Sequence, residues 1–234
     1  MTNVLFLMMG GIGFRFGAEI PKQFTIVNEK PVFRYILEAY DRSNLVNTMI
    51  VVCNEEWIEH ANDCLIDFNT NKKLLIVCGG KTRSESVKKA VESIKNMTDP
   101  DDIVMVHDAT HPYLDDKAVE EALIMMEKYD GVTICQREYD TCYSIEDSTI
   151  ISEIPKTNVV SGASPEMFRF KDMVRMYTNT TNEKLESMSS VGAMALSIGL
   201  KIGIVPSKLL NIKITLPEDM VLFKELCSTY YFKG

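Results

Sequence analysis

Short apolar runs alternate along the chain with longer segments in which apolar positions recur every three or four residues. The apolar runs have the length and character of buried strands, and they cover residues 4–9, 48–53, 74–78, 102–107 and 131–136. The segments with helical spacing cover residues 31–40, 55–67, 83–94 and 116–128. Strands that alternate with helices in this way predict an α/β fold, in which helices cover both faces of a parallel sheet.

The alternation of strands and helices stops at Arg137. From Arg137 to Lys156, two short alternating stretches flank the turn residues 146–148, and this pattern predicts a hairpin arm that projects from the sheet. The remaining segments are predicted as helices near 166–177 and 186–198, strands at 201–206 and 211–215, and a closing helix at 217–227. Neither an internal repeat nor a linker interrupts this order, so the sequence predicts one domain over residues 1–234.

Composition and charge indicate which partners the protein binds and in which compartment we expect it. The formal net charge is −8, and an acidic chain is a poor match for a nucleic acid, which selects basic surfaces. The six cysteines are widely spread without a CxxC pair, which indicates reduced thiols. The apolar run 4–9 is too short to span a membrane and follows no basic segment, so we expect a cytoplasmic protein without a membrane partner.

A glycine-rich segment, GGIGFRFGAEIPK, follows the first predicted strand over residues 10–22. A dinucleotide fingerprint would need glycine where Phe16 stands, and a P-loop would end in Gly-Lys-Ser/Thr, so neither motif is present. The segment still combines backbone that a phosphate can approach closely with two cationic side chains. The residues concerned are Gly10, Gly11, Gly13, Arg15 and Lys22. Spacing favours a phosphate site, and the alternative is a turn with two solvated cations.

Two further segments carry candidate chemistry at the ends of predicted strands. GGKTRSES (79–86) places a helix start directly after two glycines, which suits an anion or a base edge but is also ordinary helix capping. In VHDATHP (106–112), Asp108 stands where open α/β sheets bind ligands, and a carboxylate there commonly holds Mg²⁺ or a ribose hydroxyl. His107 and His111 lie in a loop and not on a helix face, so we expect a structural role for His107 instead of a histidine metal site.

Lys213 interrupts an apolar alternation in NIKITLPED (211–219). A lysine in this position either meets an anion or extends its stem to the surface, and the pattern alone leaves both readings open.

Taken in order, the segments GGIGFRFG…PKQF, GGKTRSESV, VHDATHP and NIKITLPED resemble those of the methylerythritol-phosphate cytidylyltransferase family, which includes the ribitol-5-phosphate cytidylyltransferases of wall and capsule synthesis. The similarity runs from Val4 to about Cys227 with matching intervals. It implies a Rossmann-like three-layer sandwich with a mostly parallel central sheet and a projecting β-arm. It also implies a CTP-dependent nucleotidyltransferase that uses Mg²⁺ and acts as a homodimer through the arm.

The resemblance assigns roles to residues. Arg15, Lys22 and Lys213 would stabilise the reacting phosphates and are the implied catalytic residues. CTP would be held by Gly10, Gly11, Gly13, Gly79, Gly80, Arg83, Ser86, Asp108 and Ala109. Asp108 would also contact the metal. The acceptor would be held by Asp140, Thr141, Lys156, Ser189 and His111.

Departures from the family pattern fall on the acceptor side. His111 stands where the family has arginine, Lys156 replaces an arginine of the arm, and Ser-Pro-Glu in GASPEMF (162–168) replaces Thr-Pro-Gln. SSVGA (189–193) stands where methylerythritol enzymes have Thr-Asp-Glu/Asp-Ala, so the acidic pair is missing. We therefore expect CMP transfer from CTP to a small polyol phosphate of the ribitol type. The alternatives are the methylerythritol phosphate enzyme, an inactive nucleotide-binding relative, and a different donor such as ATP or UTP.

Overall fold

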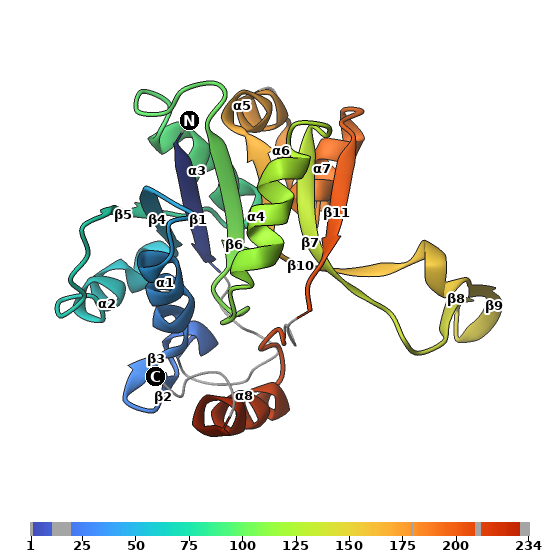
Figure 1. Cartoon of the computed structure of the whole chain (residues 1–234), viewed down its shortest axis with the longest axis horizontal. Helices are drawn as coiled ribbons and strands as arrows, with labels where there is room; N and C mark the ends of the chain where they lie inside the picture. The colour runs from blue at the N-terminus through green and yellow to red at the C-terminus, as the bar shows by residue number, and fades with distance from the viewer. Residues whose placement is uncertain (1, 11–19, 179, 209–211, 230–234) are drawn as a thin grey trace.

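A seven-stranded sheet forms the centre of the protein, in the order β11-β7-β10-β6-β1-β4-β5 (Figure 1). The computed structural model describes residues 2–10, 20–178, 180–208 and 212–229. The strands are β1 (Asn3–Met9), β4 (Thr48–Cys53), β5 (Lys73–Cys78), β6 (Ile103–Asp108), β7 (Gly131–Arg137), β10 (Val160–Arg169) and β11 (Ile202–Pro206). Neighbouring strands are parallel except where β10 pairs with β6 and β7. The prediction of a mostly parallel sheet is confirmed.

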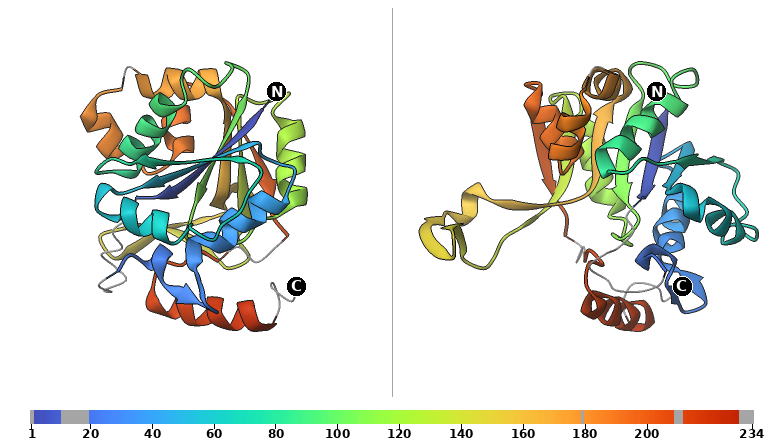
Figure 2. Two further views of the ribbon diagram at one scale, coloured as in Figure 1. Left: turned by 90° about the vertical axis from the view of Figure 1, so that its left-hand side faces the viewer. Right: turned by 180° about the vertical axis from the view of Figure 1, so that it is seen from behind.

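Helices cover both faces of this sheet, which completes the expected three-layer sandwich (Figures 1 and 2). One face is covered by α1 (Val32–Arg42), α2 (Ile58–Asp63) and α4 (Asp116–Met125). The other is covered by α3 (Arg83–Ser93), α5 (Phe170–Thr178), α6 (Asn182–Ser187) and α7 (Val191–Ser197). Alternate residues of β1 point to the two layers, because Leu5 and Leu7 join the first cluster and Val4 and Phe6 the second.

The order of the strands creates a switch point between β1 and β6. From β1 the chain moves outward to β4 and β5, and then α3 carries it back to β6 on the other side of β1. The carboxyl ends of β1 and β6 therefore lie side by side while their connections leave in opposite directions. Ligands of open α/β sheets bind in the crevice at such a point.

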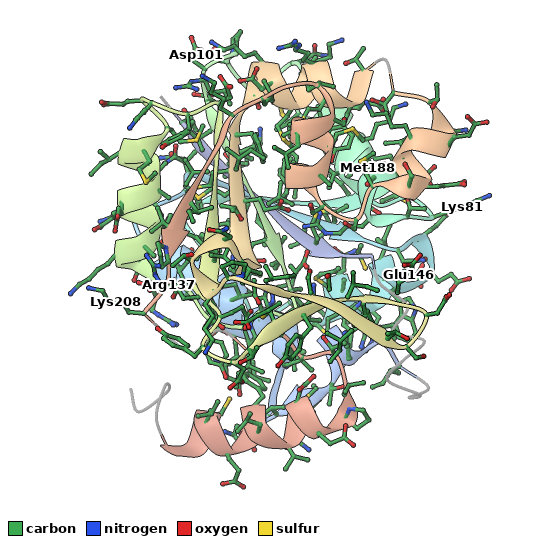
Figure 3. All side chains as sticks on the ribbon, turned by 90° about the vertical axis from the view of Figure 1, so that its right-hand side faces the viewer. Lys81, Asp101, Arg137, Glu146, Met188 and Lys208 are labelled. Carbon is green, nitrogen blue, oxygen red and sulfur yellow. The ribbon has the colours of Figure 1, made fainter. Side chains whose placement is uncertain are left out.

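The predicted arm is a separate two-stranded sheet that projects from the body of the molecule (Figure 1). It consists of β8 (Cys142–Glu146) and β9 (Thr149–Ile154), followed by the short turn η3 (Lys156–Asn158). Figure 3 shows Arg137 at the base of the arm and Glu146 at its far end. Apolar side chains on the arm, among them Ile145, Ile150 and Ile151, are exposed in the single chain.

The helix predicted near 166–177 is wrong over its first turn. Residues 160–169 form the antiparallel strand β10, and helix α5 begins only at Phe170. Pro165 argues against a central strand because proline cannot donate a ladder hydrogen bond. The structure accommodates it with an irregular register between Gly162 and Glu166; from Glu166 onward, β10 pairs with both β6 and β7.

The strand predicted at 211–215 is also wrong for the part that the structure describes. Residues 212–215 form no ladder, although Ile214 N–H donates to the carbonyl of Thr110 at 2.8 Å. The apolar alternation arises because Ile214 is buried against α8 (Pro217–Thr229), in a cluster with Tyr35 and Phe223. The short elements η1 (Lys22–Phe24), β2 (Ile26–Val27) and β3 (Lys30–Pro31) complete this end of the molecule, and η2 (Glu55–Trp57) precedes α2.

The helix predicted at 186–198 is divided in two. Helix α6 ends at Ser187, and α7 begins at Val191 after Ser190, whose hydroxyl accepts the N–H of Ala193 at 2.9 Å. The break falls within SSVGA because Ser190 is a favourable N-cap. No helix of the described chain combines the length and apolar character needed to cross a membrane.

Candidate active site

An ion-pair chain lies at the carboxyl edge of the sheet, beside the switch point. Asp108 is the last residue of β6, and its Oδ1 contacts Arg83 Nε at 3.1 Å while its Oδ2 contacts Lys213 Nζ at 2.8 Å. Arg83 is the first residue of α3, which Thr82 caps by accepting the N–H of Glu85. Burial would raise the pKa of Asp108, but Arg83 and Lys213 hold it well below its usual range, so the carboxylate stays ionised.

Glu166 extends this chain to the start of α7. Its Oε2 lies 3.3 Å from Arg83 Nη2, and it accepts the N–H groups of Val191 at 3.2 Å and Gly192 at 2.6 Å. Burial would lower the pKa of Arg83, yet Asp108 and Glu166 raise it, so the guanidinium remains charged. Five elements of the chain thus meet through charged hydrogen bonds: the end of β6, the starts of α3 and α7, β10, and the segment around Lys213.

A second hydrogen-bond chain fixes the loop after β6. His107 Nε2 donates to the carbonyl of His111 at 2.9 Å, and its Nδ1 lies 3.0 Å from the hydroxyl of Tyr40. The carbonyl can only accept, so the hydrogen of the neutral ring is on Nε2 and Tyr40 donates to Nδ1. Burial lowers the pKa of His107 to about 4. The structural role predicted for His107 is confirmed.

Ser164 connects β10 to the same loop. Its hydroxyl accepts the N–H of Asp108 at 3.2 Å and lies 2.8 Å from His111 Nδ1. Burial lowers the pKa of His111 to about 3, against the opposing effect of Asp108, so the ring is neutral at physiological pH. His111, at the position where the family pattern has arginine, therefore adds a polar contact but no charge.

The segment predicted to bind nucleotide after β5 forms a tight turn. Gly79 N–H donates to the carbonyl of Cys53 at 2.7 Å, and Gly80 N–H donates to Ser86 Oγ at 2.9 Å. A Cβ on Gly79 would lie 2.9 Å from Ser86 Oγ, and one on Gly10 would lie 3.1 Å from the same atom. Ser86 thus packs between the ends of β1 and β5 and brings the Gly79–Gly80 backbone beside Gly10.

Other predicted CTP contacts lie at the same edge. Ala109 is buried, and its N–H donates to the carbonyl of Met8 at 3.0 Å. Lys22 begins η1, and the neighbouring Gln23 donates to the carbonyl of Met9 at 2.7 Å, which returns the chain to the end of β1. Gly11, Gly13 and Arg15 lie outside the described residues.

A pocket of about 530 Å³ opens beside the ion-pair chain. Arg83, Asp108 and Lys213 line one side of it, and Ser189, Ser190 and Gly192 line another. Ser84 Oγ donates to the carbonyl of Met188 at 3.0 Å, which holds the loop before α7 against α3 (Met188 is labelled in Figure 3). His111, Ser164 and Glu166 also line the pocket.

Three of the predicted acceptor residues lie elsewhere in the single chain. Asp140, Thr141 and Lys156 are exposed on the arm, where Lys156 Nζ donates to the carbonyl of Tyr139 at 2.6 Å. The arm projects from the body of the molecule (Figures 1 and 2). None of the three residues lines the pocket. Of the acceptor residues, the structure brings only His111 and Ser189 to the pocket, and a role for the other three stays a prediction.

Asp108 is the residue that fits a Mg²⁺ ion at this site. Mg²⁺ is commonly held by one or two carboxylates together with substrate phosphates. Within the described chain, no three histidine, cysteine or acidic residues gather as a metal cage. Asp108 would supply one carboxylate, in exchange for its contact with Lys213, and phosphates would supply other ligands.

Sequence reasoning missed Glu166 and Ser164 as members of the site. Glu166 lies at the start of the segment predicted as a helix and Ser164 lies just before it, so neither residue was placed beside Asp108. The signal that pointed to them was the departure Ser-Pro-Glu itself, which placed a carboxylate in a buried apolar stretch.

Comparison with known proteins gives one consistent family. Residues 4–227 match the family model of 2-C-methyl-D-erythritol 4-phosphate cytidylyltransferase. A ribitol-5-phosphate cytidylyltransferase of Lacticaseibacillus paracasei is 27% identical over 222 residues, which cover 93% of this chain and 94% of the relative.

Solved structures of similar fold come from the same family. The 2-C-methyl-D-erythritol 4-phosphate cytidylyltransferase of Francisella tularensis has a TM-score of 0.80 at 20% identity, covering 96% of this chain and 99% of its own. The enzyme of that name from Thermus thermophilus has a TM-score of 0.73 at 19% identity, covering 97% and 98%. The family model spans nearly the whole sequence, and the chain belongs to the 2-C-methyl-D-erythritol 4-phosphate cytidylyltransferase family of CTP-dependent nucleotidyltransferases.

Proposed function

We propose that the chain transfers CMP from CTP to a small phosphorylated polyol of the ribitol 5-phosphate type, with release of pyrophosphate. The observation that carries this proposal is the pocket beside Asp108 and Lys213, whose far wall presents serine hydroxyls in place of an acidic pair. The relative from Lacticaseibacillus paracasei, named for ribitol 5-phosphate, supports the same acceptor class.

The reaction follows from charge placement. An oxygen of the acceptor phosphate attacks the α-phosphorus of CTP, a new phosphorus–oxygen bond forms, and the bond to the β-phosphate breaks to release pyrophosphate. The attacking phosphate is already ionised at neutral pH, so the protein needs to position two anions and stabilise the added charge of the transition state. Lys213 lies within 2.8 Å of Asp108 and can exchange that contact for a phosphate oxygen.

We assign the nucleotide to the carboxyl edge between β1 and β5. At this edge the backbone of Gly10 lies close to that of Gly79 and Gly80. Lys22, after the glycine-rich segment, begins η1. Arg15 would add a second cation from that segment. Asp108 and the phosphates would hold Mg²⁺, which would supply additional neutralisation of the triphosphate.

We also propose that the protein is a cytoplasmic homodimer joined through the arm. All six cysteines are free thiols, which suits a reducing compartment. The exposed isoleucines of β8 and β9 give the arm an apolar surface, and a second copy would cover it. In that arrangement Asp140, Thr141 and Lys156 of one copy would approach the pocket of the other.

Pyrophosphate release from CTP tests the function with a panel of alditol phosphates and methylerythritol phosphate, with and without Mg²⁺. We expect turnover with ribitol 5-phosphate or a close relative, and loss of turnover when the metal is chelated. Methylerythritol phosphate as the single substrate would reassign the chain to isoprenoid synthesis. CTP binding without turnover of any acceptor would identify an inactive relative, and faster reaction with ATP or UTP would overturn the donor.

The variant Lys213→Ala tests the role of the lysine. Its kcat should fall by roughly 10² to 10³, the usual effect of removing one preorganised donor to a developing charge. Lys224→Ala is the matched control, because Lys224 is exposed on α8. Equal activity in the two variants would exclude Lys213 from the reaction.

A further inference from the structure

The charges that line the pocket are balanced within the part of the chain that the structure describes. Arg83 and Lys213 contribute two positive charges, and Asp108 and Glu166 contribute two negative charges. His111 is buried and adds none. The pocket therefore has no surplus positive charge for a second anionic group on the acceptor.

Glu166 is the residue that creates this balance, and its carboxylate is held in place. Arg83 is shared between Asp108 and Glu166, while the N–H groups of Val191 and Gly192 both point to the Glu166 carboxylate. These three donors are the groups that an incoming carboxylate or phosphate would otherwise use at this wall.

The contact between Glu166 and α7 depends on the absence of a side chain at Gly192. A Cβ at this position would lie 3.0 Å from Glu166 Oε1, closer than ordinary van der Waals contact. The short hydrogen bond of 2.6 Å between Gly192 N and Oε1 confirms the close approach. The position of the Glu166 carboxylate therefore depends on glycine at position 192.

The same carboxylate can still accept a hydroxyl. An ionised carboxylate has about four acceptor positions. Arg83 and Val191 occupy Oε2 and Gly192 occupies Oε1, which leaves about one position on Oε1. Ser189 and Ser190 line the wall beside it. The wall therefore suits neutral hydroxyl groups and opposes anions.

We propose that Glu166 determines acceptor specificity: it admits the hydroxyl-bearing end of a polyol phosphate and rejects an acceptor that carries a carboxylate at that end. This inference rests on the proposed function, because it concerns the acceptor of that reaction. The physical basis is repulsion between like charges at a wall where Arg83 is already neutralised, which is discrimination by an unfavourable contact with the wrong ligand.

Two ligands of equal length separate the effect of charge from the effect of size. Ribitol 5-phosphate ends in a CH₂OH group, and 5-phosphoribonate has a carboxylate in its place. The measured quantity is the ratio of kcat/KM for the two acceptors at saturating CTP, and the ratio of their dissociation constants by calorimetry. The unsubstituted protein should favour the alditol phosphate.

Glu166→Gln keeps the shape of the side chain and removes its charge. The preference for the alditol phosphate should fall by about ten-fold, the size expected for one charge acting across a partly hydrated pocket. Glu186→Gln is the matched control, since Glu186 is exposed on α6 and the substitution changes net charge equally. It should retain the preference of the unsubstituted protein.

Gly192→Ala separates the charge of Glu166 from its position. The added Cβ displaces the carboxylate without removing it, so affinity for both acceptors should fall while the alditol phosphate stays preferred. Folding of each variant is checked by thermal unfolding and by CTP affinity.

The outcomes distinguish this inference from the proposed function. An unchanged ratio in Glu166→Gln overturns the role of Glu166 even when ribitol 5-phosphate is a good substrate. Failure of every alditol phosphate in turnover overturns the proposed acceptor class, and the calorimetric ratio then still decides the role of Glu166. Binding of neither ligand, or equal binding of both by the unsubstituted protein, overturns the inference.

Discussion

Two buried residues, His107 and Ser86, shape this site through hydrogen bonds to backbone groups. His107 is fully buried and fixes the loop after β6 by donating to the carbonyl of His111. Ser86 likewise accepts from Gly80 N–H and donates to the carbonyl of Thr82. Such residues fix the positions of the strand ends that surround the charged side chains of the site.

The buried histidines make folding stability depend on pH. The pKa of His107 falls from 6.5 to about 4 on folding, so the unfolded chain binds the proton more readily. The stabilisation from its neutral, buried form is complete above pH 6.5 and is lost as the pH falls toward 4. His111 acts in the same direction, with a folded pKa of about 3.

His107→Gln should therefore reduce the dependence of unfolding free energy on pH. The Gln amide retains a donor for the carbonyl of His111, while about 1.4 kcal/mol per pH unit is removed from the slope between pH 4 and 6. Urea unfolding at half-unit pH intervals measures the slope of the unfolding free energy against pH. His60→Gln is the control for loss of an exposed histidine. A slope equal to that of the unsubstituted protein contradicts this assignment.

At the scale of elements, the spacing of apolar residues predicted the helices that bury one face against the sheet and the strands that form apolar runs. In α3, Val87, Ala90 and Val91 recur at helical spacing, and all three are buried, as is Ile94 directly after the helix. The strand β10 was not predicted, because it contains Pro165 and is buried without alternation between two neighbours. Pairing that joins residues 60 positions apart leaves no local pattern, so Glu166 could not be placed beside Asp108.

In the candidate site, too, the sequence predicted features next to a strand but not contacts between residues far apart in the chain. Asp108 and the Gly79–Gly80 turn follow directly from strands, and the sequence placed them at the sheet edge. The partners Arg83–Glu166 and Asp108–Lys213 join residues 83 and 105 positions apart, respectively. Resemblance suggested that Arg83, Asp108 and Lys213 share a site, whereas the presence of Glu166 and all of these contacts required the structure.

Helix α8 anchors the segment that carries Lys213. Phe223 is fully buried in a cluster with Tyr35, Tyr113 and Ile214, next to the lysine. Phe223→Ala should lower the free energy of unfolding by about 3 to 5 kcal/mol through loss of burial and the cavity that remains. Leu222→Ala is the control, since Leu222 lies on the same helix and is 46% exposed. Similar losses of stability in chemical unfolding of the two variants would contradict this role of Phe223.

At the scale of the whole molecule, the arm is the feature that a single chain leaves uncovered. Ile145 and Ile150 are paired across β8 and β9, with exposed fractions of 71% and 59%. The double variant Ile145→Lys/Ile150→Lys should be monomeric in sedimentation at concentrations where the unsubstituted protein is a dimer, because charge opposes burial of this surface.

Ile124→Lys is the matched control for the arm variant. Ile124 is 70% exposed on α4, so the substitution changes an equally exposed isoleucine away from the arm. It should leave the sedimentation coefficient unchanged. A monomeric unsubstituted protein, or a dimer that survives the double variant, would exclude the arm as the interface.

Strand β10 runs from the arm to the pocket. The chain leaves β9, passes through η3, and enters β10, which bears Ser164 and Glu166 further along. In the proposed dimer, a partner chain that binds the arm would hold one end of β10, and residues further along β10 would contact the proposed acceptor. Dimerisation and acceptor affinity would then be thermodynamically linked, and linkage is reciprocal: an acceptor that orders β10 strengthens association of the two copies by the factor with which association tightens acceptor binding.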